Sequence, residues 1–91
     1  MNDTTTQILT DRGKDYGVFM DLASIAQFLK TVLREQPGWV VLDSDMKESL
    51  DIIVTKTARI LNGNPKHLDS WDDIAGYARL VADRLREDSL K

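Results

Sequence analysis

Apolar residues recur every three to four positions in three long stretches of the chain, which is the period of an α-helix with one buried face. These stretches cover roughly residues 19–35, 45–61 and 70–87, and a shorter, weakly apolar stretch covers roughly residues 5–12. The joints between them are marked by Gly13 and Gly17, by Pro37-Gly38 and by Gly63-Asn64-Pro65. No alternation of period two competes, so the sequence predicts an all-α fold: a small bundle of about four helices, one short and three longer.

The stretch from Phe19 to Glu35 is apolar over more than half of the helical circumference. A helix on the surface of a monomer needs a narrower stripe. The width indicates burial against more than one neighbour, either as the central helix of the bundle or at a contact between subunits. A chain of 91 residues also has room for only a small core. We therefore expect one helical domain over residues 1–91, with its core in 10–87 and frayed ends, that forms a homo-oligomer.

The stretch over residues 45–61 is clearly amphipathic. Its polar side carries Glu48, Asp51, Thr55, Arg59 and Asn62, spaced three and four apart, with Lys56 on the flank. One explanation is a solvated surface with pairs of opposite charge along the helix. The other is a pocket for an anion or a metal-bridged ligand, formed together with Lys14, Asp15 and Tyr16 in the preceding glycine-rich joint, where a loop between helices is expected.

The last helix is predicted to begin at Ser70, because Ser70 and Asp73 have the spacing of a capping box and acidic side chains favour the first turn of a helix. Gly76 inside this helix costs about 1 kcal/mol relative to alanine. A close helix crossing is the preferred explanation, ahead of a functional reason. Trp71 and Tyr77 are expected at the core and its rim. His67 is expected to be exposed and without a role.

Composition narrows the classes of function. The chain has 12 basic and 15 acidic residues, a net charge of −3, one histidine and no cysteine. Scattered basic residues argue against a general polyanion binder. The lack of cysteine excludes disulfides, thiolate metal sites and cysteine nucleophiles, and fits a reducing cytoplasm. No run approaches the roughly 20 apolar residues of a membrane span, so a soluble cytoplasmic protein is expected.

Three motifs occur in order along the chain: Arg12-Gly13-Lys14-Asp15-Tyr16-Gly17, then Lys56-x-x-Arg59 ahead of Asn62-Gly63, then Asp69-x-x-x-Asp73-x-x-Gly76-Tyr77. Over about residues 10–85 they resemble a family of small proteins of unknown function that is common in phages and prophages. More distantly, the chain is similar to helical domains associated with nucleotide modification in phage genomes and to the MazG-like all-α nucleotide pyrophosphohydrolases. The resemblance implies a protein that acts in the cytoplasm of a bacterial host cell.

The MazG comparison implies carboxylates from two helices that hold Mg²⁺ beside a triphosphate. Glu48-x-x-Asp51 matches the second acidic pair of that pattern, and these two residues are the metal candidates. The first pair is absent, because the preceding helix offers only Asp21 and Glu35 near its ends. No catalytic residue is assigned, and the sequence favours a protein that is not an enzyme without deciding the point. A bound magnesium ion is expected only if the chain is a MazG-like enzyme.

We expect a non-catalytic accessory protein of phage or prophage type, a homo-oligomeric binding module that acts on a host or phage protein or on a nucleotide. The first alternative is a MazG-like, Mg²⁺-dependent nucleotide pyrophosphohydrolase or a nucleotide binder. The second is a small nucleic-acid-binding regulator, although nucleic acid is an unlikely match for this charge pattern; no membrane partner is expected. The candidate ligand-binding residues are Arg12, Lys14, Asp15, Tyr16, Lys56, Arg59, Asn62, Asp73 and Tyr77.

Overall fold

The computed structural model describes residues 3–91. The elements are α1 (Asp3–Tyr16), α2 (Phe19–Glu35), a short 3₁₀ helix η1 (Pro37–Val41), α3 (Ser44–Asn62) and α4 (Leu68–Asp88). There is no strand in this part of the chain, so the predicted all-α fold with one shorter and three longer α-helices is confirmed. None of the helices described combines the length and the apolarity that a membrane span requires.

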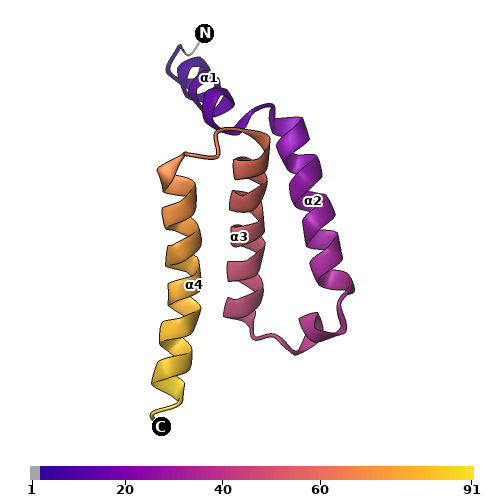
Figure 1. Ribbon diagram of the computed structural model, residues 1–91, viewed down its shortest axis with the longest axis vertical. Coiled ribbons are helices and arrows are strands. Elements are labelled where there is room, and N and C mark those ends of the chain that lie inside the picture. Colours follow the sequence, from indigo (N-terminus) through magenta and orange to yellow (C-terminus); the bar gives the residue numbers. More distant parts are fainter. Residues whose placement is uncertain (1–2) are drawn as a thin grey trace.

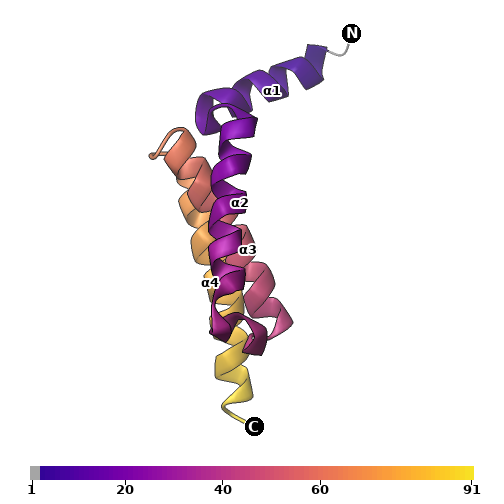
Figure 2. The same ribbon diagram turned by 90° about the vertical axis from the view of Figure 1, so that its right-hand side faces the viewer.

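Helices α2, α3 and α4 lie side by side in one layer with α3 in the middle (Figure 1). Helix α1 lies across the end of the layer where α2 begins and projects away from it (Figure 2). The molecule is elongated, with principal extents of 54, 27 and 26 Å. The central position that the wide apolar pattern of residues 19–35 suggested therefore belongs to α3, and α2 lies at an edge of the layer.

Very little of this layer is fully buried. The buried apolar side chains are Leu22 and Ala26 of α2 and Ala58 of α3, and Tyr16 and Ile25 pack against them. Small residues at the contact let helices approach closely, which is why the α2–α3 contact is built on two alanines. The apolar residues over the rest of the layer stay partly or largely exposed. Three helices in one layer therefore do not enclose a hydrophobic core on all sides.

Helix α1 is longer than predicted and differs most from the expected pattern. It continues through Gly13 to Tyr16, so Lys14, Asp15 and Tyr16 form its last turn and not a loop. A glycine inside a helix costs only about 1 kcal/mol, which neighbouring contacts offset. The change of direction occurs at Gly17, which has a φ of 77° that favours glycine.

The capping box predicted at Ser70 is wrong. Helix α4 begins at Leu68 after His67, and no side chain caps its start. The Ser70 amide donates to the His67 carbonyl at 3.2 Å, so Ser70 already lies inside the first turn, where it is 2% exposed. Asp73 points instead to Lys56 of α3. The close crossing expected at Gly76 is also wrong, because no atom lies within 4 Å of the position that a Cβ there would take.

Candidate ligand-binding site

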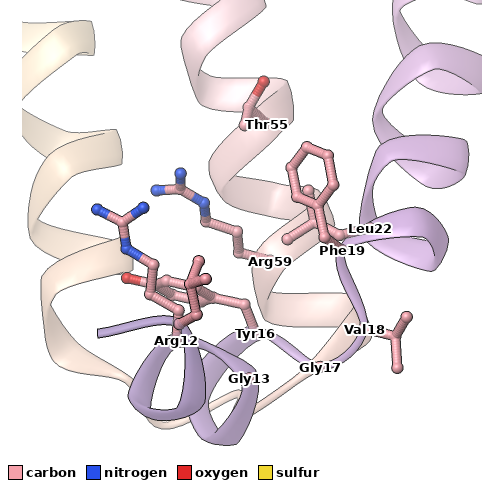
Figure 3. A pocket seen from close by; sticks show the side chains of 10 residues that line it. Arg12, Gly13, Tyr16, Gly17, Val18, Phe19, Leu22, Thr55 and Arg59 are labelled. Atoms are coloured by element: carbon pink, nitrogen blue, oxygen red, sulfur yellow. The ribbon is translucent and has the colours of Figure 1, made fainter. Parts of the chain in front are cut away.

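A pocket of about 720 Å³ lies where α1 meets α2 and α3, which is within the usual size range of small-molecule sites (Figure 3). We call it the apolar pocket. It is lined by Leu9, Arg12, Gly13, Tyr16, Gly17, Val18, Phe19, Leu22, Thr55 and Arg59. Most of its wall is aliphatic or aromatic, and the Phe19 side chain at its edge is 78% exposed. The pocket therefore offers an apolar surface that the chain itself does not fill.

Two arginines provide the charge of the apolar pocket, and no carboxylate lines it. Arg12 comes from α1 and Arg59 from α3, both line this pocket, and in Figure 3 their guanidinium groups extend to the same side as the Tyr16 ring. The Arg59 guanidinium lies 4.8 Å from the centre of that ring, a cation–π contact. In the described part of the chain, neither guanidinium forms an ion pair. Both are free to bind an anion.

A second pocket of about 430 Å³ adjoins the first and shares Thr55 and Arg59 with it. We call it the polar pocket. It is lined by Lys30, Glu48, Asp51, Ile52, Thr55, Lys56, Arg59 and Tyr77. Its side chains come from α2, α3 and α4, so it runs across the middle of the layer. The polar side of residues 45–61 thus contributes to a concave surface instead of a plain solvated one.

Asp51 is the most constrained acid of the polar pocket. Its Oδ2 accepts from Arg34 at 2.8 Å, whereas its Oδ1 is buried and has no hydrogen-bond partner among the described residues. Glu48 lies one helical turn earlier and is exposed. A buried acceptor without a donor is unfavourable in a folded protein and marks a place where a ligand group or a water can bind.

Lys56 and Asp73 join α3 to α4 beside the same pocket. Their Nζ and Oδ2 atoms lie 2.9 Å apart. The hydrogen bond and the charge of Lys56 lower the pKa of Asp73, and the more distant charges of Arg59 and His67 act in the same direction. Asp73 therefore stays ionised and holds Lys56 at the pocket wall.

Two of the remaining predicted residues form the joint between α1, α2 and the end of α3. Asn62 bonds to the backbone of Tyr16 and Val18, and the Asp15 carbonyl accepts from the Asn64 amide at 2.6 Å. A Cβ on Gly63 would overlap that carbonyl, so glycine is required by the close approach. Lys14 differs from the prediction, because it points to solvent and faces Asp11 of its own helix at 3.9 Å.

The predicted exposure of His67 is wrong, because its ring packs against residues of α1; that it has no role stays a prediction. Its side chain is 20% exposed, its Nε2 lies 3.6 Å from the Asp15 carboxylate, and its ring meets the Tyr16 ring edge-on at 5.3 Å. No local pattern around residue 67 signals these contacts, because both partners lie about fifty positions away in the chain. Phe19 and Leu9 were also missed as pocket residues, although the wide apolar pattern of residues 19–35 was a hint for Phe19.

A divalent ion has few suitable donors within one chain. Among residues 3–91, no group of three or more acidic or histidine side chains converges. Glu48 and Asp51 line one pocket, but Arg34 already binds Asp51, and Lys30, Lys56 and Arg59 share the same walls. Magnesium prefers carboxylates that are free to bind it. These residues alone do not fit a magnesium site, and the metal assignment of Glu48 and Asp51 stays a prediction.

Comparison with known proteins gives a family. Residues 1–85 match the DUF6378 family, which is described as a domain of unknown function. The chain belongs to the DUF6378 family. No curated protein and no solved structure matches the chain. The expected membership in a family of unknown function is thereby confirmed. All three motifs of this DUF6378 member contribute residues to the two pockets, to the joint or to the ion pair beside them: Lys-Asp-Tyr-Gly, Lys-x-x-Arg and Gly-Tyr.

Proposed function

We propose that this DUF6378 member is a non-catalytic, homo-oligomeric binding module whose ligand is an organic phosphate of the nucleotide class. The observation that carries the proposal is the pair of guanidinium groups of Arg12 and Arg59 beside the Tyr16 ring, without carboxylate partners in the described part of the chain (Figure 3). Arginine is suited to phosphate because its planar group donates two parallel hydrogen bonds. Two such groups at one pocket match a phosphate better than a neutral ligand.

The shape of the two pockets supports a nucleotide over inorganic phosphate. Leu9, Phe19 and Leu22 offer an apolar wall on which a planar base can lie. The adjoining polar pocket supplies Lys30 and Lys56 as further cations and the Tyr77 hydroxyl as a hydrogen-bonding group. An apolar wall with a small number of convergent polar groups is the usual composition of a small-molecule site.

The resemblance of the three motifs to small phage and prophage proteins supports the wider part of the proposal. We propose an accessory role in the cytoplasm of a bacterial host cell, in which the module binds its ligand and does not transform it. A host or phage protein is the second class of partner for such a module. A protein partner is favoured if no nucleotide binds, because another molecule would then have to cover the exposed apolar residues around the pockets.

A Mg²⁺-dependent nucleotide hydrolase related to the MazG-like enzymes is the runner-up. The observation that favours it is the buried, unsatisfied Oδ1 of Asp51 in the pocket that adjoins the two arginines. The cationic lining of that pocket and the small number of carboxylates support binding ahead of hydrolysis.

Calorimetry and thermal shift with nucleoside mono-, di- and triphosphates, with and without Mg²⁺, test the proposal. Ligands that bind only the folded state raise the melting temperature. We expect nucleotides to bind and the corresponding nucleosides to fail. Arg12→Ala and Arg59→Ala should each weaken binding at least tenfold, about 1.4 kcal/mol. The matched control is Arg79→Ala, which removes an exposed arginine of α4 that pairs with Asp83 outside both pockets.

Three outcomes are decisive. If no nucleotide binds, or if the two pocket variants bind as well as the wild type, the proposed ligand class is wrong. Release of phosphate or pyrophosphate in the presence of Mg²⁺, lost in Asp51→Asn and Glu48→Gln, would replace the binding module with the hydrolase. Salt-dependent binding of DNA or RNA instead of nucleotides would favour the regulator.

A further inference from the structure

We infer that a second copy of this chain docks on the apolar face of the α2–α3–α4 layer, which is the face opposite the two pockets. We define this apolar face by its exposed side chains: Phe28 and Val32 of α2, Leu61 of α3, and Trp71 and Leu85 of α4. The inference deepens the oligomeric part of the proposed function. It does not depend on the identity of the ligand.

The helical period places the pockets and the apolar face on different sides of the layer. On α3, at about 100° per residue, Leu61 lies about 160° around the helix from the pocket residue Arg59 and about 120° from Thr55. On α2, the pocket residue Lys30 lies roughly opposite Phe28 and Val32 by the same count. Helix α1 lines the apolar pocket with Leu9 and Arg12 and projects to one side of the layer only, so it leaves the other side uncovered (Figure 2).

The exposure of this face is large for each of its members. Phe28 is 68% exposed, Leu61 65% and Trp71 52%. Single exposed apolar residues are normal, but a patch that continues over three neighbouring helices marks an interaction surface. Half-buried apolar residues lie on the same helices: Leu29 and Val81 lie between the exposed members of α2 and α4, and Leu50 lies on α3. Apolar side chains therefore recur on this side of all three helices.

The accessible area of the chain indicates how much surface a partner has to cover. The chain exposes 6634 Å². A compact monomer of 10.3 kDa exposes about 5,400 Å², so the surplus is about 1,200 Å² per chain. Stable protein interfaces of standard size bury about 800 Å² on each partner, and obligate dimers bury more. The surplus of the whole chain is larger than the area that a standard interface buries on each partner, so a dimer interface of that size fits within it.

The radius of gyration agrees with this estimate. It is 15.8 Å, whereas a compact domain of this length has about 12 Å. Domains bury the apolar side of one layer of secondary structure against a second layer. This chain has one layer, and a second copy related by a two-fold axis supplies the other, because a single apolar patch then covers itself. Two layers of three helices enclose the apolar face and leave both pairs of pockets outside.

The mass of the full chain in solution, measured by light scattering coupled to size exclusion, tests the inference. We expect twice 10.3 kDa, or a higher even multiple. Phe28→Glu should shift the mass to that of the monomer. Leu80→Glu is the matched control, because Leu80 is 64% exposed, lies on α4 toward the other side of that helix and is outside the apolar face. A monomeric wild type overturns the inference, as does an oligomer that dissociates with Leu80→Glu and persists with Phe28→Glu.

A second measurement covers the case in which Phe28→Glu fails to fold. The chain has no cysteine, so single thiols can be introduced and their rates of alkylation compared. The thiol of Val32→Cys should react at least tenfold more slowly than that of Leu80→Cys, and the difference should disappear on dilution as the dimer dissociates. Equal rates at all concentrations overturn the inference. Nucleotide binding without a dimer would refute this interface alone, and a dimer without nucleotide binding would refute the proposed ligand alone.

Discussion

The side-chain amide of Asn62, the last residue of α3, donates a hydrogen bond of 2.9 Å to the backbone carbonyl of Tyr16, the last residue of α1. The same amide nitrogen donates to the Val18 carbonyl at 3.0 Å. One side chain therefore holds both sides of the α1–α2 turn against the end of α3. This contact fixes the backbone of Tyr16 and so the position of its ring beneath Arg59.

We predict that Asn62→Ala destabilises the fold by about 1–3 kcal/mol, because the Tyr16 carbonyl loses this donor and the Val18 carbonyl keeps only the Leu22 amide. Urea unfolding followed by circular dichroism measures the loss. Asn64→Ala is the matched control, since the Asn64 side chain accepts only from the neighbouring Lys66 amide at an exposed position. Equal effects of the two variants would show that the joint does not depend on the Asn62 side chain.

Two glycines of the same motif should respond to alanine with opposite signs. Gly17 has a positive φ, and a Cβ there would overlap the Asn62 carbonyl, so Gly17→Ala should cost more than the about 1–2 kcal/mol of the left-handed conformation alone. Gly13 lies inside α1 with no atom within 4 Å of its Cβ position, so Gly13→Ala should gain up to about 1 kcal/mol. The melting temperatures of both variants test this prediction. A higher melting temperature for Gly17→Ala would contradict it.

Gly76→Ala should stabilise the fold by up to about 1 kcal/mol, because α4 gains a better helix former where the space is open. A shift in melting temperature of about 4–8 °C is expected for each kcal/mol in a domain of this size. A lower melting temperature would show that another chain approaches the backbone of α4 at this position.

Arg84 should make stability depend on pH in the acid range. Its guanidinium donates to Asp45 of α3, to Asp43 at 2.9 Å and to Asp88 at 3.1 Å. The hydrogen bond from Arg84 is the largest cause that lowers the pKa of Asp45 below its usual 3.8. Because the folded state has the lower pKa, this contribution is complete above pH 3.8 and is lost as the pH falls through the folded value.

We therefore predict that the melting temperature falls as the pH drops below about 4, and that Arg84→Gln shows a shallower fall from a lower starting value. Melts between pH 2 and pH 7 measure both slopes. Lys66→Gln is the control, because the described contacts of Lys66 include no ion pair. Part of the fall remains in Arg84→Gln, since Lys56 also lowers the pKa of Asp73. Identical slopes for wild type and Arg84→Gln would contradict the prediction.

Replacing Tyr16 separates the role of its ring from that of its hydroxyl. Tyr16→Phe keeps the aromatic face beneath the Arg59 guanidinium and should bind nucleotides within about twofold of the wild type. Tyr16→Leu removes that face, a loss of about 0.5–1 kcal/mol or roughly two- to fivefold in affinity. Calorimetry compares the two variants. Binding that weakens as much in Tyr16→Phe as in Tyr16→Leu would assign the effect to the hydroxyl.

The sequence predicted α2 and α3 to within a residue or two, because each has a strong helical period and clear glycine or proline punctuation at its ends. It missed the C-terminal end of α1 and the start of α4 for a physical reason. Gly13 and Ser70 look like boundaries, yet each lies within a helix, where local hydrogen bonds outweigh a weak propensity.

The candidate site was predicted in part. Arg12, Tyr16 and Arg59 were found through motifs, and the structure brings them to one pocket. The contacts of His67 with Asp15 and Tyr16 were not found, because they depend on the path of the chain around α3 and leave no periodic signal. Lys14 belongs to the same motif as Tyr16, but helical geometry turns it away from the pocket.

Helix α1 is anchored only near its C-terminal end, and the rest of it extends beyond the layer (Figure 2). A change at the exposed end of α1 would reach Arg12 through the helix itself, because Arg12 lies in α1 five residues before Gly17. Under the proposed function, a partner that held or moved the exposed end of α1 would therefore change the affinity of the apolar pocket for its ligand.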